Sequence, residues 1–412
     1  MRRDRPVAIP QTFRLAAALL ALAALTVFPA LAAEPAEDDP PQVLRNPEWG
    51  PPVTPYVFEG DVRDLPRPQP WKPGDPIREI PQRIYRAPGR QAPPEPETGL
   101  DPLLALQPSF TQAEESATGL TIGTFATPTR SFSGIDFTGA WPPDPVGDVG
   151  PQHYIQMTNR LFNGDPGSLV RIFDKAEPTP NELASFALES IAPLDSPCGN
   201  GFCDPIVLYD RQADRWLLSE IMDLSDSVCV YVSRTGDPVA GGWYVYEIEW
   251  PDFPDYPKFA VWSTDANGGA GSYVMTLNTT LPTIAALDRG AMLAGEPTSH
   301  VSFETDALSG FLLRIVTPAE PDGPLGRPVG APDLVMRHRD TEIHDGVTAP
   351  ADLLDLWLLD ADWQSPLSTT LTATAGIDVS EFDSTVCGLG WVGCFPQPGT
   401  TRTLDPLREI ML

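Results

Sequence analysis

From residue 117 to residue 412, the chain alternates short apolar runs with turns made of Gly, Pro, Asp and Asn. The runs are rich in Val, Ile, Tyr, Phe, Trp and Thr, and examples are HYIQMTN (153–159), PIVLYD (205–210), SVCVYVS (227–233) and WYVYEIEW (243–250). Runs of this composition and length, bounded by turn residues, predict β-strands. Amphipathic helical stretches are few, with 181–191 and 284–293 as the best candidates. We therefore expect an all-β fold.

A loose internal repeat favours a β-propeller over a β-sandwich. The stretch VLYDRQADRWLLS (207–219) contains a strand, a turn that Asp210 and Asp214 are expected to cap, and Trp216 at the start of the next strand. Looser versions of this pattern recur at 170–178, 284–295 and 354–363. Hairpins of this kind suit propeller blades of roughly 40–50 residues. Residues 117–412 would then form a propeller of about six blades.

The first 32 residues have the three parts of a signal peptide. MRRDR (1–5) supplies positive charge, residues 15–29 are an apolar stretch, and Ala30-Leu31-Ala32 is a small-x-small cleavage site. No other run approaches the roughly 18 apolar residues that a spanning helix needs. We expect a secreted or periplasmic protein without a membrane span after signal cleavage.

Proline dominates residues 33–116, in stretches such as RDLPRPQPWKPGDP. A segment so rich in proline cannot build the interior of a helix or a sheet, and it buries little apolar surface. We expect an extended linker or an arm that wraps a neighbouring surface, with the propeller domain beginning at residue 117.

The five cysteines fit an exported protein, in which disulfides are permitted. Cys198 with Cys203, and Cys387 with Cys394, each flank a Gly-rich loop and could form local disulfides. Cys198 with Cys229 is an alternative, and the odd count leaves one thiol over. The spacing lacks the paired CxxC motifs that a structural zinc site favours.

The net charge restricts the partners. The chain has 27 Lys and Arg against 56 Asp and Glu, a formal charge of −29 that is spread along the sequence. This balance argues against nucleic acid and against an anionic membrane surface as partners.

Six segments occur in an order that resembles a known family. They are PPDPVGDVGPQHYIQMTN (142–159), CDPIVLYDRQADRWLLSE (203–220), VCVYVSRTGDPVAGGWYVYEI (228–248), PDYPKFAVW (254–262), LDLWLLDADWQSPLSTTL (354–371) and CFPQPGTTRTLDPL (394–407). Together they resemble a family of exported bacterial proteins with a sialidase-like β-propeller, over residues 135–412. The resemblance implies a propeller fold but no defined reaction, because most members lack an established one. Family members continue into a further strand-rich segment, so the resemblance also implies an incomplete last blade.

Two loops are candidates for calcium binding. In PPDPVGDVGP (142–151), Asp144 and Asp148 could begin an oxygen-rich calcium site, act as a catalytic carboxylate pair, or accept hydrogen bonds from the backbone of their own turn. In TDANGG (264–269), Asp265 and Asn267 resemble part of a calcium loop or of an ordinary hairpin turn.

The sequence lacks the common catalytic signatures GxSxG and HExxH and the phosphate-binding loop. RHRDTEIHD (337–345) collects two histidines with acidic residues, but its arginines would repel a metal, so we interpret it as a solvated loop. A sialidase-type reaction would need an Arg cluster and a Tyr activated by a Glu. Candidates are Arg215, Arg234, Arg289, Arg314 and Arg337, with Tyr244, Tyr246 and Glu247. Convergence of carboxylates and arginines at one mouth of the ring would distinguish an enzyme from a binding protein.

The loop PDFPDYPKF (251–259) is the candidate ligand-binding loop, through Asp252, Phe253, Asp255 and Tyr256. The aromatics Trp243, Tyr244, Trp250, Tyr256 and Trp262 are expected to pack mainly between blades rather than to stack on sugars. The leading hypothesis is a non-catalytic propeller, stabilised by Ca²⁺, that binds an extracellular glycan or a cell-surface protein. The alternatives are a glycoside hydrolase or lyase of sialidase-like type, and a structural adhesion module.

Overall fold

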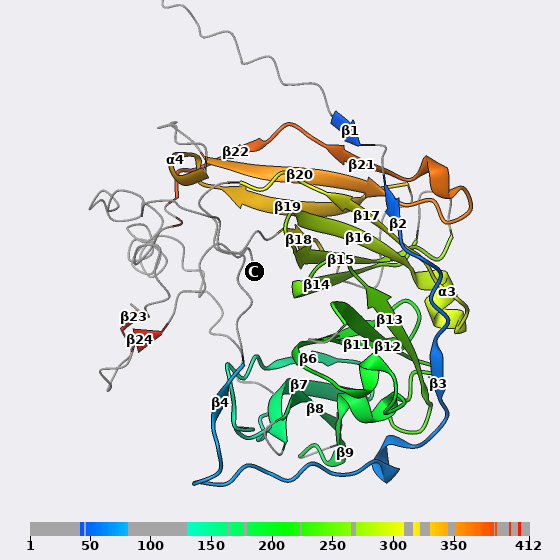
Figure 1. Ribbon diagram of the computed structural model, residues 1–412, viewed down its shortest axis with the longest axis vertical. Helices are drawn as coiled ribbons and strands as arrows, with labels where there is room; N and C mark the ends of the chain where they lie inside the picture. Colours follow the sequence, from blue (N-terminus) through cyan, green and yellow to red (C-terminus); the bar gives the residue numbers. More distant parts are fainter. Residues whose placement is uncertain are drawn as a thin grey trace, which may run out of the picture. The chain divides into compact units, whose positions relative to one another are not determined.

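The computed structural model describes residues 42–44, 47–80, 130–162, 165–176, 179–222, 225–264, 269–308, 316–321, 330–344, 352–382, 384, 395–396 and 403–404. The chain divides into two units, residues 1–40 and 41–412. Every described residue belongs to the second unit (Figure 1).

Most of the described residues lie in antiparallel sheets that follow one another along the chain, so the expectation of an all-β fold is confirmed. Blade 1 contains β6 (Val146–Val149), β7 (His153–Phe162), β8 (Asp165–Asp174) and β9 (Glu182–Ala187). Blade 2 contains β10 (Cys203–Asp210), β11 (Arg215–Met222), β12 (Ser227–Ser233) and β13 (Trp243–Glu249). Blade 3 contains β14 (Asp255–Trp262), β15 (Ser272–Asn278), β16 (Pro282–Asp288) and β17 (His300–Glu304). Blade 4 contains β18 (Thr317–Pro318), β19 (Asp333–Arg339), β20 (Asp352–Asp360), β21 (Thr370–Ala373) and β22 (Ile377–Val379).

The first strand of each blade lies beside the first strand of the next. β10 contacts both β6 and β14, and β14 contacts β18 (Figure 1). Radial sheets whose first strands neighbour one another are blades of a β-propeller. We call β6, β10, β14 and β18 the inner strands. The described residues contain four such blades, and the predicted total of about six stays a prediction.

Helices in the described residues are short. They are α3 (Arg289–Ala294), α4 (Thr341–His344) and the 3₁₀ turns η1 (Val62–Asp64), η2 (Leu188–Ile191), η3 (Pro197–Gly199) and η4 (Pro366–Ser368). A separate hairpin pairs β23 (Phe395–Pro396) with β24 (Thr403–Leu404). The helices suggested for 181–191 and 284–293 are largely wrong. Both stretches begin as strands, β9 and β16, because pairing with β8 and β15 overrides a weak helical pattern.

Part of the proline-rich segment adds strands to the outer edges of the blades. β1 (Gln42–Leu44) pairs with β21, β2 (Glu48–Trp49) with β17, and β3 (Tyr56–Phe58) with β13. β4 (Arg78–Glu79) then pairs in parallel with β5 (Ala140–Trp141). The segment therefore meets blades 4, 3 and 2 in reverse order (Figure 1). Covered edge strands cannot pair with other chains, and proline is tolerated at such edges.

The core lies within and between the blades. Trp216, Trp243, Tyr246 and Tyr273 are almost completely buried. Trp250 and Trp262 are buried as well, so the expectation of core packing is confirmed for three of the five aromatics named for blades 2 and 3. Tyr244 and Tyr256 are only partly buried.

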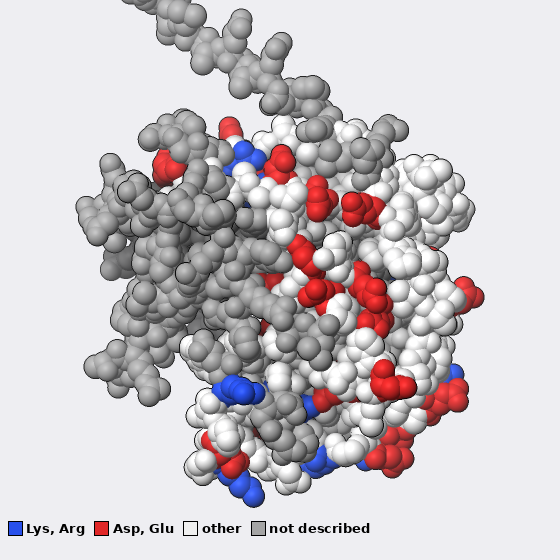
Figure 2. Space-filling model, in the orientation of Figure 1, with Lys and Arg blue, Asp and Glu red and all other residues white. Residues whose placement is uncertain are grey.

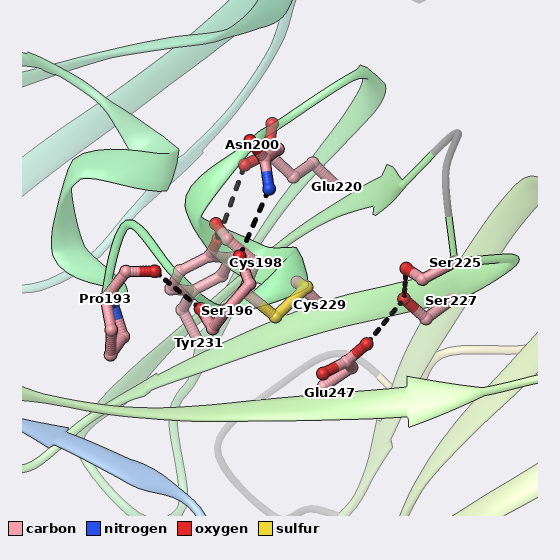
Figure 3. Close-up of a disulfide and its surroundings, with 10 residues drawn as sticks. All are labelled: Pro193, Ser196, Cys198, Asn200, Glu220, Ser225, Ser227, Cys229, Tyr231 and Glu247. Carbon is pink, nitrogen blue, oxygen red and sulfur yellow. Dashed lines mark hydrogen bonds between the residues drawn. A yellow bond between two sulfur atoms is a disulfide. The ribbon is translucent and has the colours of Figure 1, made fainter.

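The disulfide joins Cys198 in η3 to Cys229 in β12 (Figure 3). Cys203 is a buried free thiol. The proposed local pair of Cys198 with Cys203 is therefore wrong, since Cys203 enters β10. Cys387 and Cys394 lie outside the described residues. Cys229 stands opposite Glu220 in the β11–β12 pair, and the Tyr231 hydroxyl donates to the Cys198 carbonyl at 3.3 Å. These contacts anchor the loop that leads into β10.

Candidate active site

Three carboxylates lie at the starts of three consecutive inner strands. Asp144 precedes β6, Asp204 is the second residue of β10, and Asp255 is the first residue of β14. The negative charges of Asp255 and Asp144 both act on Asp204, so the three side chains share one electrostatic environment. Each of them is partly buried, which leaves the cluster accessible to solvent. We call Asp144, Asp204 and Asp255 the carboxylate cluster.

The backbone is unusual at each of these strand starts. Asp144, Asp204 and Tyr256 have positive φ angles of 41°, 56° and 52°, which side-chain-bearing residues seldom adopt. The strand register also shifts between Cys203 and Ile206 in β10, and between Asp255 and Lys258 in β14. Such outliers and bulges redirect side chains and are concentrated at functional sites.

Buried asparagines on the second strand of a blade hold the cluster. The Nδ2 of Asn159, in β7, donates to the Asp144 carboxylate at 2.8 Å, and its Oδ1 accepts from the backbone N–H of Asp204 at 3.1 Å. One side chain therefore connects the Asp144 carboxylate to the backbone of Asp204 in blade 2. Asn278, in β15, donates to the Asp255 carboxylate at 3.0 Å. Groups oriented in this way need little reorganisation during a reaction.

The pKa values of all three carboxylates are raised, and burial is the largest cause in each case. Burial, followed by the charges of Asp255 and Asp144, raises the pKa of Asp204 to about 7. Burial raises the pKa of Asp255 to about 6 and also raises that of Asp144. The charge of Lys258 opposes the shift at both Asp144 and Asp204. Near neutral pH the cluster can therefore hold a protonated carboxyl beside an ionised one, the combination that general acid–base catalysis requires.

Lys258 supplies a positive charge next to the carboxylate cluster. Burial lowers the pKa of Lys258, while the charges of Asp204 and Asp144 raise it. Its Nζ lies 4.4 Å from the centre of the Tyr256 ring. The arrangement combines positive charge, a phenol and three carboxylates on the inner strands of blades 1 to 3.

The four residues of the candidate ligand-binding loop do not all lie together. Asp255 and Tyr256 lie at the carboxylate cluster. Phe253 is buried against Phe202, with ring centroids 6.2 Å apart. Asp252 accepts a hydrogen bond from the Thr280 backbone N–H at 3.1 Å. Ligand binding by these residues stays a prediction.

The two candidate calcium ligands of the loop 142–151 have different partners. Asp144 belongs to the carboxylate cluster, whereas Asp148 accepts from the backbone N–H groups of Val149 at 2.6 Å and Tyr209 at 2.7 Å. Asp148 thereby ties inner strand β6 to inner strand β10. Asp265 and Asn267 lie outside the described residues. Calcium at these positions stays a prediction.

Sequence reasoning missed Asp204, Asn159 and Lys258. A signal for the carboxylates was present, because blades 1, 2 and 3 each begin with an Asp followed closely by Pro, in PPDP (142–145), CDP (203–205) and PDYP (254–257). Proline lacks an N–H and suits the first positions of a strand. This repeat marks equivalent positions in three blades.

The prediction of a solvated loop at 337–345 is wrong for residues 337–344. Arg337, Asp340 and His344 are buried, because residues 337–339 form the end of β19 and residues 341–344 form the helix α4. Arg337 and Arg339 both bind Asp355, each through a nitrogen 2.8 Å from its carboxylate.

Carboxylate oxygens of Asp340, Glu342 and Asp352 lie within 4.8 Å of one another, close enough to bind one metal ion. Asp352 already accepts from the backbone N–H groups of Thr341 at 2.9 Å and Phe382 at 2.7 Å. We call Asp340, Glu342 and Asp352 the acidic cluster.

No protein-family model and no curated protein matches the sequence. Six solved chains match by structure. One is a provisionally assigned glycoside hydrolase from Parabacteroides distasonis, with 11% identity and a TM-score of 0.33 over 59% of this chain and 74% of that one. Another is an α-L-arabinofuranosidase from Podospora anserina, with 12% identity and a TM-score of 0.29 over 55% and 69%. Similarity at this level assigns neither a fold nor an activity to the chain.

None of the helices within the described residues has the length and apolar character needed to cross a membrane.

Proposed function

We propose that the protein hydrolyses glycosidic bonds of an extracellular carbohydrate at the carboxylate cluster. This proposal replaces the non-catalytic binding protein as the preferred hypothesis. The observation that carries it is the convergence of Asp144, Asp204 and Asp255, all with raised pKa values, at the starts of adjacent inner strands.

In the proposed reaction, Asp204 is the general acid. It donates its proton to the glycosidic oxygen as the bond from that oxygen to the anomeric carbon breaks. A water molecule attacks the anomeric carbon and gives a proton to Asp144, which Lys258 helps to keep ionised. Asp255 contributes the negative charge that raises the pKa of the acid.

Charge supports a carbohydrate rather than a nucleic acid as the substrate. Acidic side chains are spread over the described part of the face shown in Figure 2, and the formal charge of the chain is −29. A polyanionic substrate would be repelled by such a surface. Cleavage of an acetal needs a carboxylic acid and a carboxylate, and these are the groups gathered here.

The proposal is tested by incubating the protein with a pooled library of neutral and acidic glycans and measuring bound and released sugars by mass spectrometry. We expect shortened products. Retained but intact sugars would contradict hydrolysis and return the preference to a carbohydrate-binding module. Neither retention nor cleavage by a folded sample would favour a cell-surface protein as the partner.

Export, the sialidase-like family and the domain boundaries remain part of this proposal. A signal peptide at 1–32, an arm at 33–116 and a propeller domain at 117–412 describe an exported protein. The disulfide between Cys198 and Cys229 supports an oxidising compartment.

We also propose that calcium stabilises the fold, with the acidic cluster as the stronger candidate site. Calcium at 100 times its dissociation constant would add about 2.7 kcal/mol to the free energy of unfolding. Chelation with EGTA should therefore lower the melting temperature of the wild type by several degrees. Glu342→Gln should remove this response if the acidic cluster binds the ion, and Asp148→Asn should remove it if the loop 142–151 does. A wild-type melting curve that EGTA leaves unchanged would contradict calcium binding at both places.

A further inference from the structure

An exposed aromatic side chain lies close to the carboxylate cluster in the sequence. Trp141 is 55% exposed, although tryptophan is usually well buried. Two further large apolar residues are exposed just before the paired strands β5 and β4, Phe137 at 40% and Ile77 at 61%. Exposed apolar side chains in neighbouring segments are candidates for a binding surface.

The backbone around Trp141 is held firmly. The Trp141 carbonyl accepts from the backbone N–H of Ile80 at 2.8 Å, and the Gly139 carbonyl accepts from that of Arg78 at 3.0 Å. Ala140, between them, is completely buried. Because neighbouring residues of a strand point to opposite faces, anchoring Ala140 in the core turns the Trp141 side chain outward.

Trp141 is also tied to the carboxylate cluster. It precedes Asp144 by three residues, so their Cα atoms can be at most about 11 Å apart. The Nδ2 of Asn159 donates both to the Pro142 carbonyl, at 3.1 Å, and to the Asp144 carboxylate, at 2.8 Å. One buried amide therefore positions the chain next to Trp141 and a carboxylate of the site.

We propose that Trp141 is the aromatic platform of a sugar-binding subsite next to the carboxylate cluster, and that the substrate is an oligosaccharide occupying at least two subsites. This inference rests on the proposed function. The apolar C–H face of a sugar ring packs on the flat, rigid indole, while its hydroxyl groups stay in water or bind polar groups at the rim. A platform outside the cleavage point binds a neighbouring sugar unit and so selects longer chains over single residues.

The experiment compares the wild type with Trp141→Ala, Trp141→Phe and Tyr56→Ala. Tyr56 is a matched control, because it is 44% exposed but lies on β3 at the outer edge of blade 2. Substrates are gluco-, manno-, xylo- and arabino-oligosaccharides of two to six units. The corresponding glycosyl fluorides serve as substrates that fill a single subsite.

We expect Trp141→Ala to lower kcat/KM for the cleaved oligosaccharide about tenfold and to change it less than twofold for the glycosyl fluoride. Trp141→Phe should restore part of the loss, and Tyr56→Ala should behave as the wild type. Equal rates for Trp141→Ala and the wild type on the oligosaccharide would overturn the subsite and leave the proposed hydrolysis intact.

A binding titration separates the subsite from the reaction. Oligosaccharides are titrated into Asp204→Asn, and into the same variant with Trp141→Ala, with affinity measured by calorimetry. Affinity that falls about tenfold with the second substitution supports the subsite even if the wild type hydrolyses nothing, a result that would overturn the proposed function alone. Unchanged affinity overturns the subsite.

Discussion

Asp204→Asn should reduce hydrolysis at neutral pH by about 10²–10⁴-fold while the protein remains folded. An amide has nearly the same shape as the carboxyl group but cannot donate an acidic proton to the glycosidic oxygen, and acid–base groups contribute about this much to catalysis. Asp362→Asn is the matched control, because Asp362 follows β20 of blade 4 and accepts from the backbone N–H groups of Gln364 and Ser365, outside the carboxylate cluster. The measurement is kcat/KM on the substrate found by mass spectrometry. A loss below about fivefold would contradict the role of Asp204 as the acid.

The pH dependence provides a second test of the same residue. Activity of the wild type should fall as pH rises through about 7, because the pKa of Asp204 is raised to about 7 and the acid must be protonated. On the acid side, activity should fall as Asp144 gains a proton, at a pH above the usual aspartate value because burial raises its pKa. Loss of activity only above pH 9 would assign the acid to another group.

Asp204→Asn should change stability in the opposite sense to activity. Because the pKa of Asp204 rises from 3.8 to about 7 on folding, the folded state is favoured below pH 4 and loses that advantage as pH rises from about 4 to 7. The full change corresponds to about 4 kcal/mol, and solvent that reaches the partly exposed side chain reduces it. Asp204→Asn should therefore be more stable than the wild type at pH 8 and similar to it near pH 4. Urea unfolding at the two pH values measures the difference.

Arg289→Met should destabilise the protein by about 3–5 kcal/mol, because it leaves a buried carboxylate without its partner. Asp210 is 0% exposed and binds Arg289 through Nε at 2.6 Å and through the second terminal nitrogen at 2.9 Å. It also accepts from the Tyr273 hydroxyl at 3.0 Å. The pair joins the β10–β11 turn of blade 2 to α3 and β15 of blade 3, so its loss should loosen the contact between the blades.

The control for this prediction is a similar ion pair at the surface. Arg234 lies 3.3 Å from Glu59, whose side chain is 76% exposed, and exposed pairs contribute about 0–1 kcal/mol. Arg234→Met should therefore unfold at nearly the same urea concentration as the wild type. Adding Asp210→Asn to Arg289→Met should recover part of the lost stability, because the unpaired charge is removed. A destabilisation below about 1 kcal/mol for Arg289→Met would show that the ion pair is dispensable.

Much of the local structure could be read from the chain. Strands were predicted from alternation and turn residues, because both signals depend on neighbours a few residues apart. The turn at Asp210 behaves as expected, since its carboxylate accepts from the Ala213 backbone N–H at 3.1 Å. Asp210 also binds Arg289 of the next blade, and no pattern in the neighbouring sequence indicates this contact.

In the candidate site, too, sequence patterns indicate single residues, and only the fold brings them together. Asp144 and Asp255 were selected separately, one for calcium and one for ligand binding, and Asp204 was not selected at all. Their common environment depends on β6, β10 and β14 being neighbours, and these strands begin about 50–60 residues apart in the sequence.

The sequence by itself determined the strands, their turns and the repeated Asp–Pro starts, because these follow from backbone preferences within a few residues. Only the tertiary structure decided that Cys198 pairs with Cys229, that residues 337–344 are largely buried, and that three aspartates share one electrostatic environment. Pairing, burial and charge interaction depend on which distant segments pack together. Packing is a property of the whole set of blades, so no single stretch of sequence contains it.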